Sequence, residues 1–462
     1  MRRQIPVVFG LIVLLSVAPA GAQQRGMRAP PLEQPVLHEI AQDVSAARIR
    51  SDISRLVSFG TRHTLSDTRS DTRGIGAARR WMQAQFQQIG RDCRGCLEVV
   101  LQSSFVEGET RIPGRAEIVN VLAIQRGQTD PNRYVVISGD IDSRVTDVMD
   151  STSDSPGAND NASGLAAVLE AARVLSRYKF SGSIVYAGLS GEEQGLYGGK
   201  IMAGKAREDG WRVEAVLNND MIGNISGING VTDNSTARIF SEGTRAVETP
   251  EEARWRRFHG GENDSPSRNL ARYIDVMADR YIPNLDAMLV FRLDRFGRGG
   301  HHRPFNDAGF AAVRVMETNE HYDRQHQDIR VENGVQYGDV LEGVNFEYAA
   351  KLTALNAVSL ASLAWAPPSP DRVTITGAVS PDTTLSWKRA GRREAPHLAG
   401  YKIYWRPTDA AVWTDSRFVG DVETYTLENV VVDNYFFGVA SVSQSGFESA
   451  VVFPGPEPAP VN

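Results

Sequence analysis

Short apolar runs alternate with amphipathic stretches over the first three quarters of the chain. Four runs are rich in aliphatic and β-branched residues, as buried strands are: 117–124 (EIVNVLAI), 134–138 (YVVIS), 183–187 (SIVYA) and 213–217 (VEAVL). Apolar residues recur at helical spacing over 37–56, 75–89 and 164–178, and a further helix is expected after Gly195. This alternation predicts an α/β domain with a mixed, largely parallel central sheet flanked by helices.

The pattern is less regular between residues 225 and 298. A helix is expected over 267–280, and a basic aromatic run, RWRRF, occupies 254–258. We interpret this run as the exposed face of a helix, with the wall of a substrate pocket as the alternative. A strand over 311–316 and a long helix over 346–365 complete the domain.

The pattern of apolar and polar residues changes after residues 366–370 (APPSP), which form a stiff Pro-rich linker. Short strands separated by turns follow, at 373–376, 384–387, 401–406, 424–427 and 435–442. They predict an all-β, immunoglobulin-like sandwich over 371–455, with a tail at 456–462. This module resembles a fibronectin type III domain, with Trp387 in its core and Tyr435 as its corner tyrosine. We expect the two modules to fold separately.

The N-terminus has the pattern of a signal peptide over residues 1–22. Arg2 and Arg3 precede an apolar core at 7–17, and a small-residue cleavage site ends at Ala22. The alternative, a membrane anchor, would need a longer apolar run. The sequence therefore predicts export, to the periplasm or the medium, of a catalytic domain over 23–365 without a stable membrane anchor.

Composition narrows the class of protein. The 462 residues have a formal net charge of −6, which argues against nucleic acid as a partner. The two cysteines, Cys93 and Cys96, are three residues apart. In an exported protein with no second cysteine pair, a local disulfide is favoured over redox chemistry or half of a zinc site.

Carboxylates follow the ends of the predicted strands. Glu192 and Glu193 lie in a Gly-rich turn, LSGEEQG, and their side chains leave an extended backbone in opposite directions. One can therefore bind a metal while the other acts as a base. Asp140, Asp160 and Asp220 occupy comparable positions, although helix capping is the alternative role of the segment around Asp160. Together these groups predict a hydrolytic two-metal centre.

In this order, the segments PGANDNASG (156–164), GEEQG (191–195) and NDMIG (219–223) resemble metallopeptidase family 28, the co-catalytic two-zinc aminopeptidases. The resemblance covers roughly residues 120–328. It implies that Asp160 bridges two divalent ions, zinc in the family, with Glu193 on one and Asp220 on the other. Glu192 would carry a proton from the bridging water to the leaving amine.

The resemblance also implies a late histidine ligand. His326, in QHQD, matches the family motif best, and His321 is the alternative. His301 and His302 would support the site without binding the metal.

One position departs from the family pattern. Asp140 stands where the family has its first histidine ligand, in GDID. A carboxylate can bind zinc, but an all-oxygen set favours harder ions such as manganese at that position. Asp142, which would orient that histidine, loses this role. A serine hydrolase is excluded, because the turn at Ser190 lacks the final glycine of a nucleophile elbow.

These observations predict an exported metal-dependent exopeptidase that hydrolyses N-terminal residues from peptides. Two alternatives stay open. One is another enzyme of the same scaffold, a carboxypeptidase or dipeptidase. The other is a binding or adhesion protein with a degenerate metal site.

Overall fold

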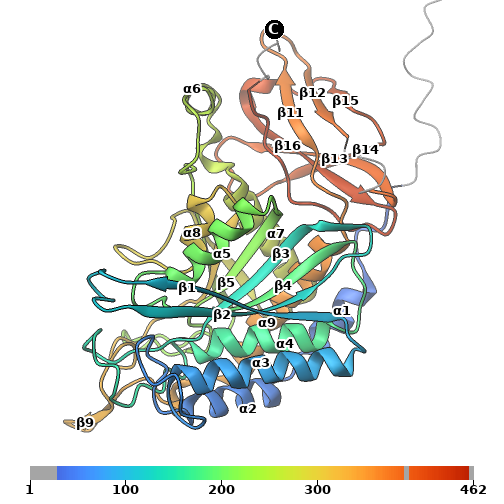
Figure 1. The fold of residues 1–462 in the computed structure, drawn as a ribbon. Helices are drawn as coiled ribbons and strands as arrows, with labels where there is room; N and C mark the ends of the chain where they lie inside the picture. Colours follow the sequence, from blue (N-terminus) through green and yellow to red (C-terminus); the bar gives the residue numbers. More distant parts are fainter. Residues whose placement is uncertain (1–28, 390–394, 457–462) are drawn as a thin grey trace, which may run out of the picture.

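The structure is a computed structural model that describes residues 29–389 and 395–456. A large α/β part carries a smaller all-β part on one side (Figure 1). The predicted signal peptide lies outside the described residues. No helix among those described is long and apolar enough to span a bilayer.

An eight-stranded sheet forms the centre of the α/β part, in the order β1-β2-β4-β3-β5-β8-β6-β7. The four central strands β4, β3, β5 and β8 are parallel, while β2 and β6 join them in antiparallel fashion. The strands are β1 (Leu97–Val106), β2 (Ala116–Gln125), β3 (Asp130–Asp140), β4 (Gly182–Leu189), β5 (Arg212–Asn219), β6 (Thr236–Ser241), β7 (Asp286–Val290) and β8 (Ala312–Glu317). The predicted mixed, largely parallel sheet is confirmed.

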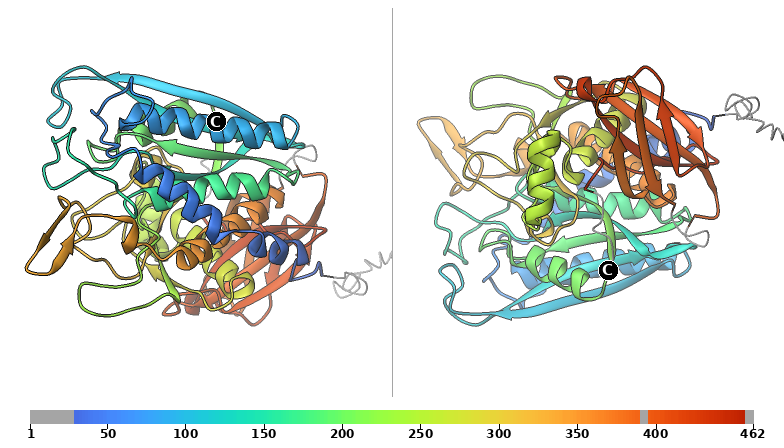
Figure 2. Two further views of the ribbon diagram at one scale, coloured as in Figure 1. Left: turned by 90° about the horizontal axis from the view of Figure 1, so that it is seen from below. Right: turned by 90° about the horizontal axis from the view of Figure 1, so that it is seen from above.

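Helices cover both faces of the sheet (Figure 2). One face carries α1 (Pro35–Gln42), α2 (Ala46–Val57), α3 (Gly74–Asp92), α4 (Ala162–Leu175), α7 (Pro266–Tyr281) and α9 (Phe346–Trp365). The other carries α5 (Tyr197–Glu208) and α8 (His302–Asp307). Side chains of β4 alternate between two cores, so that Ile184 and Tyr186 join the first and Val185 the second. Burial on both faces explains why the central strands are continuous apolar runs.

Several elements differ from those expected. The helical pattern over 37–56 forms two helices, because Ser45 leaves the helix and its side chain caps α2 by accepting from the Arg48 amide. Helix α3 continues past Gly90 to Asp92. Strands β1, β6 and β7 were not expected. In β1 every residue is exposed or half-buried, so no clear hydrophobic pattern marks the strand.

The C-terminal part contains two antiparallel three-stranded sheets. Their strands are β11 (Asp371–Thr376), β12 (Thr383–Lys388), β13 (Leu398–Pro407), β14 (Asp415–Gly420), β15 (Thr424–Leu427) and β16 (Tyr435–Ser443). Trp387 is buried between the sheets and lies 5.3 Å from the ring of Tyr401, as expected of a core tryptophan. Assignment to the fibronectin type III class stays a prediction.

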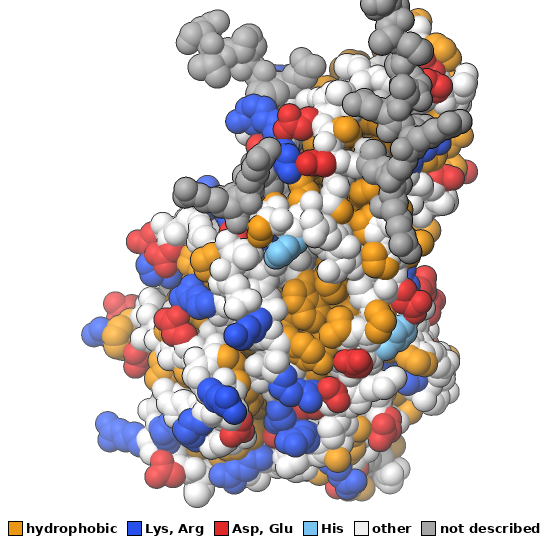
Figure 3. All heavy atoms as spheres, turned by 90° about the vertical axis from the view of Figure 1, so that its right-hand side faces the viewer, with side chains coloured by type: hydrophobic (Ala, Val, Ile, Leu, Met, Phe, Trp, Pro, Cys, Tyr) orange, Lys and Arg blue, Asp and Glu red, His pale blue; other side chains and the backbone are white. Residues whose placement is uncertain are grey.

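The two parts share a buried junction. Arg406 of β13 donates to Asp264, which precedes α7, at 2.7 Å, and the Ser441 hydroxyl donates to the Pro367 and Pro368 carbonyls. Trp365 at the end of α9 stacks on Phe447 at 4.9 Å. Because of these contacts, the linker is packed against both parts and does not act as a free hinge. Hydrophobic side chains also gather at mid-height on one side of the molecule (Figure 3).

The basic aromatic run at 254–258 forms half of α6 (Pro250–His259), which has no buried residue. Phe258 is 87% exposed, and the Trp255 indole donates to the Pro454 carbonyl of the C-terminal part. The exposed-helix interpretation fits these contacts.

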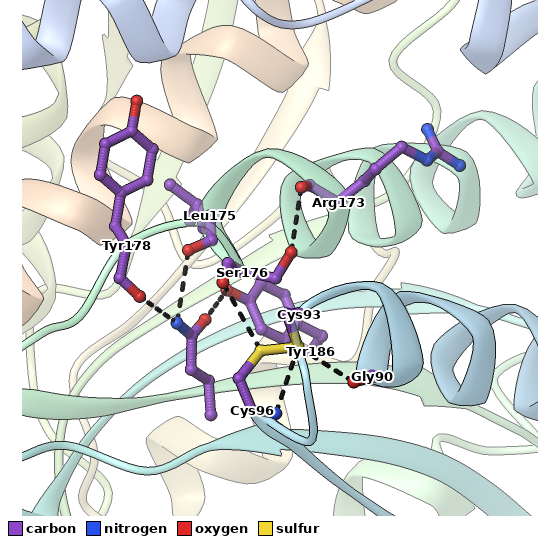
Figure 4. Close-up of a disulfide and its surroundings, with 9 residues drawn as sticks. Gly90, Cys93, Cys96, Arg173, Leu175, Ser176, Tyr178 and Tyr186 are labelled. Carbon is purple, nitrogen blue, oxygen red and sulfur yellow. Dashed lines mark hydrogen bonds between the residues drawn. A yellow bond between two sulfur atoms is a disulfide. The ribbon is translucent and has the colours of Figure 1, made fainter.

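Cys93 and Cys96 form a disulfide just beyond α3, as predicted (Figure 4). The Cys96 sulfur lies 3.5 Å from the Ser176 carbonyl at the C-terminal end of α4. The bridge therefore lies at the opposite end of α4 from the carboxylates described next.

Candidate metal centre

The carboxyl ends of the parallel strands bring the predicted acids together. Asp140 is the last residue of β3, Glu192 and Glu193 follow β4, and Asp220 follows β5. Because these strands are neighbours, their ends meet at one edge of the sheet, where α/β proteins bind ligands. Asp160 joins them from the segment that enters α4.

The turn that carries the two glutamates is held by Asp142. Its carboxylate accepts from the amides of Glu192 at 3.2 Å and Glu193 at 3.0 Å, and from the Thr64 hydroxyl at 2.9 Å. Gly191 has a φ of 76°, which a residue with a side chain rarely adopts. Asp142 thus positions both glutamates, a role that the sequence did not indicate.

The segment before α4 combines a helix cap with Asp160, an acid whose side chain is 11% exposed. The Asn161 side chain caps α4 by accepting from the Gly164 amide. Asp339, far along the chain, accepts from the amides of Asn159 and of Asp160, the latter at 2.6 Å. The Asp160 carboxylate is therefore free to face the site. No local pattern around Asp339 could have predicted this contact.

Asp160, Glu193 and His326 form a potential metal site. The His326 Nε2 atom lies 2.9 Å from an oxygen of Asp160 and 2.9 Å from an oxygen of Glu193. One ligand atom from each residue falls within 4.8 Å of the others. Two carboxylates and an imidazole are a donor set that suits zinc, so these residues fit one divalent ion. The structure places His326 here, as the preferred alternative, and His321 elsewhere.

Arg144 contacts two residues of this cluster, Glu193 and His326. Its Nε donates to Glu193 at 2.9 Å, and its Nη2 lies 2.6 Å from His326 Nδ1. It belongs to the loop after β3, and no pattern in the sequence indicated its role.

Asp140 and Asp220, the other two predicted ligands, are engaged elsewhere. Asp140 contacts His301 Nδ1 at 2.5 Å and accepts from the Asn161 amide group at 2.7 Å. Asp220 forms an ion pair with Arg314 at 2.9 Å. Among the described residues, Asp140, Asp160 and Asp220 do not bring three ligand atoms together as the first cluster does.

The acids do not all favour the same protonation state. Burial, then the charge of Glu193, raises the pKa of Glu192 well above its usual range. Burial likewise raises the pKa of Asp220 to about 8 although Arg314 opposes it. Burial alone would lower the pKa of His326, but Glu193 and Asp160 raise it to about 9. Burial opposes ionisation of both acids, but His326, with Arg295 beside Asp160 and Arg144 beside Glu193, lowers the pKa of each.

A cleft of about 610 Å³ opens over these groups. Its lining includes Asp160, Glu192, Glu193, Asp220 and His326, and also six basic residues: Arg111, Arg144, Lys200, Arg295, Arg298 and Arg303. Arg144 and Arg295 pair with carboxylates, whereas the other four, Arg111, Lys200, Arg298 and Arg303, form no ion pair in the described part of the chain. A mainly cationic wall therefore faces the acidic floor of the cleft.

Comparison with known proteins identifies the class. Residues 120–335 match peptidase family M28. The chain is 43% identical to a probable zinc metalloprotease of Leptosphaeria maculans over 92% of this chain and 98% of that protein. It is also 43% identical to one of Pyricularia oryzae over 90% of this chain and 83% of that protein. The chain therefore belongs to peptidase family M28, a family of metal-dependent hydrolases.

Solved structures agree on the fold. LapB from Legionella pneumophila matches with a TM-score of 0.53 and 20% identity, covering 72% of this chain and 76% of that one. The LapA aminopeptidase of the same organism matches with a TM-score of 0.53 and 19% identity, over 73% and 77%. At this identity the likeness shows the aminopeptidase-like fold alone.

Proposed function

We propose that the protein is an exported, zinc-dependent exopeptidase that removes N-terminal residues from peptides. The observation that carries the proposal is the cluster of Asp160, Glu193 and His326 with Glu192 beside it at the floor of one cleft. The relatives named as zinc metalloproteases support zinc as the ion. Export rests on the pattern of residues 1–22 and is tested by sequencing the N-terminus of the secreted protein.

Each residue of the floor has a distinct part. Asp160, Glu193 and His326 would hold an ion, which would polarise the carbonyl of the scissile bond. Glu192 accepts a proton from the attacking water and returns it to the leaving amine. Its raised pKa suits a group that must keep a proton between these two transfers. Asp142 keeps Glu192 in place through its backbone amide.

Glu192→Gln tests the base. The variant keeps the size and hydrogen-bonding of the side chain but cannot accept the proton, so we expect turnover to fall about 100- to 10,000-fold. Metal content should match that of the wild type. Glu208→Gln, on the exposed side of α5, is the matched control and should be fully active. Wild-type turnover in Glu192→Gln with its metal bound would exclude Glu192 as the base.

The cationic wall favours a second candidate. Lys200, Arg298 and Arg303 could bind the free carboxylate at the C-terminus of a peptide, as a carboxypeptidase or a dipeptidase requires. One panel of peptides separates these functions. An aminopeptidase cleaves a tripeptide whose C-terminus is amidated but not one whose N-terminus is acetylated and whose C-terminus is free. A carboxypeptidase cleaves the second peptide but not the first. A dipeptidase requires both free ends.

A further inference from the structure

Arg314 contacts Asp220, the acid that the family resemblance assigns to a second ion. It is on β8, and its side chain is completely buried. Its Nη2 contacts Asp220 at 2.9 Å, and its Nη1 contacts Asp294 at 3.1 Å and the Gly299 carbonyl at 2.8 Å. Three groups thus fix the position of the guanidinium, and one of them is Asp220, the acid that a second ion would need as a ligand.

Asp140, the other acid assigned to that ion, is equally committed. Both of its oxygens are used, one by His301 and one by Asn161. The Asp140 side chain is 3% exposed and the His301 side chain 0%, so neither has space to turn towards a metal without leaving the other unpaired. Asp140 therefore acts here as the hydrogen-bond partner of an imidazole.

The charge around Arg314 supports the same conclusion. Asp220, Asp294, Glu192 and Asp160 all stabilise the charged form of Arg314, so it is a permanent cation. A divalent ion that bound Asp220 would face this cation across one carboxylate, in a buried space where charges are poorly screened. The residues beside Asp220 therefore do not fit a second ion, whereas Asp160, Glu193 and His326 fit the first.

We propose that this chain binds one divalent ion, at Asp160, Glu193 and His326, and that the Arg314 guanidinium takes the place of a second ion beside Asp220. This inference deepens the proposed function and rests on it for the first ion. Arg314 then supplies a fixed positive charge next to Asp220 that does not depend on the concentration of metal.

Metal stoichiometry tests the proposal independently of peptidase activity. The full-length protein is saturated with zinc, freed of excess by gel filtration and analysed by plasma mass spectrometry. We expect one ion per chain. Two ions would overturn the inference and leave the proposed function intact. No ion would overturn the proposed function itself.

Arg314→Met tests the role of the guanidinium. Methionine removes the charge but keeps an unbranched side chain. Asp220 then becomes available to hold an ion together with Asp160, without Asp140, and we expect a second ion to bind. Arg303→Met is the matched control, since it removes a cleft cation that has no carboxylate partner among the described residues, and it should keep one ion. A folded Arg314→Met protein with one ion would overturn the assignment of Arg314.

Two further variants keep the proposal testable if Arg314→Met does not fold. Asp220→Asn preserves the shape of the side chain and should leave both the single ion and its affinity within about twofold of wild type. His326→Ala should lose the ion. Loss of bound zinc in Asp220→Asn, measured by calorimetric titration, would show that Asp220 is a ligand and would overturn the proposal.

Discussion

The buried ion pairs between the two parts of the chain lead to a prediction about stability. Asp264 lies between two arginines, Arg272 of α7 at 3.1 Å and Arg406 of β13 at 2.7 Å, and all three side chains are at most 2% exposed. Asp264→Asn removes the only negative charge of this triad and leaves two buried guanidiniums. Breaking a buried pair in this way costs about 3–5 kcal/mol.

The cost follows from burial and not from a strong attraction. Burial raises the pKa of Asp264 in spite of Arg272 and Arg406, so desolvation outweighs the attraction of both arginines. The triad need not contribute net stability, but a partner left alone must be destabilising. Arg406→Met leaves Asp264 still paired with Arg272, and we expect it to cost less than Asp264→Asn. The double variant should be less destabilised than the sum of the two.

Thermal unfolding followed by Trp fluorescence measures the effect. At about 2.1 cal/mol/K per residue, a cooperative unit of roughly 420 residues, the described part of the chain, shifts in Tm by about 1 °C per kcal/mol. Asp264→Asn should therefore lower Tm by about 3–5 °C. Arg417→Met, an exposed change on β14, is the control and should stay within about 0.5 °C. If Asp264→Asn behaves like this control, the junction does not couple the two parts.

Two predictions concern regions outside the cleft. Burial raises the pKa of Glu242 from 4.5 to about 7, so its stabilising contribution is complete below pH 4.5 and is lost as the pH rises through 7. Glu242→Gln should thus be more stable than wild type at pH 8, by up to about 3 kcal/mol, and should show no gain near pH 4. Thermal unfolding at both pH values measures the difference, and a gain that does not vary with pH would refute this assignment. Replacing both Cys93 and Cys96 by serine opens a short loop and should cost about 2 kcal/mol without changing turnover. A loss of activity at a temperature where the variant is folded would contradict the separation of the disulfide from the site.

The sequence predicted the parts of the fold that follow from local periodicity. The long helix at 346–365 has the bounds expected, because both its apolar repeat and the Pro-rich segment after it are local signals. The acids at the strand ends were likewise predicted. The buried strands are continuous apolar runs that can be recognised in the sequence, and the acids follow directly after them. Strand β1 was missed because its exposed positions carry no clear repeat.

The site depends on contacts that no local pattern encodes. Asp339 holds the amides of Asn159 and Asp160, and Asp142 holds those of Glu192 and Glu193. In each case the partners lie 50 or more residues apart, and hydrogen bonds to backbone amides leave no mark on the side chains of the residues that donate them. A carboxylate that organises a loop cannot be distinguished by sequence from one that binds a metal.

The contact between Asp140 and His301 shows how a second residue can accommodate the aspartate that replaces the family's first histidine ligand. An aspartate in place of the histidine that the family resemblance implies adds a fifth acid to a buried floor that already holds four, and burial, then the charge of Asp142, raises its pKa. Such a group is tolerated when donors satisfy it, and His301 and Asn161 supply two. Burial lowers the pKa of His301 to about 4, so the imidazole is neutral and its Nδ1–H can donate to Asp140. Asp140, the position that departs from the family, and His301, which the sequence assigned to a supporting role, therefore form one hydrogen-bonded unit, so a substitution of either should perturb the other.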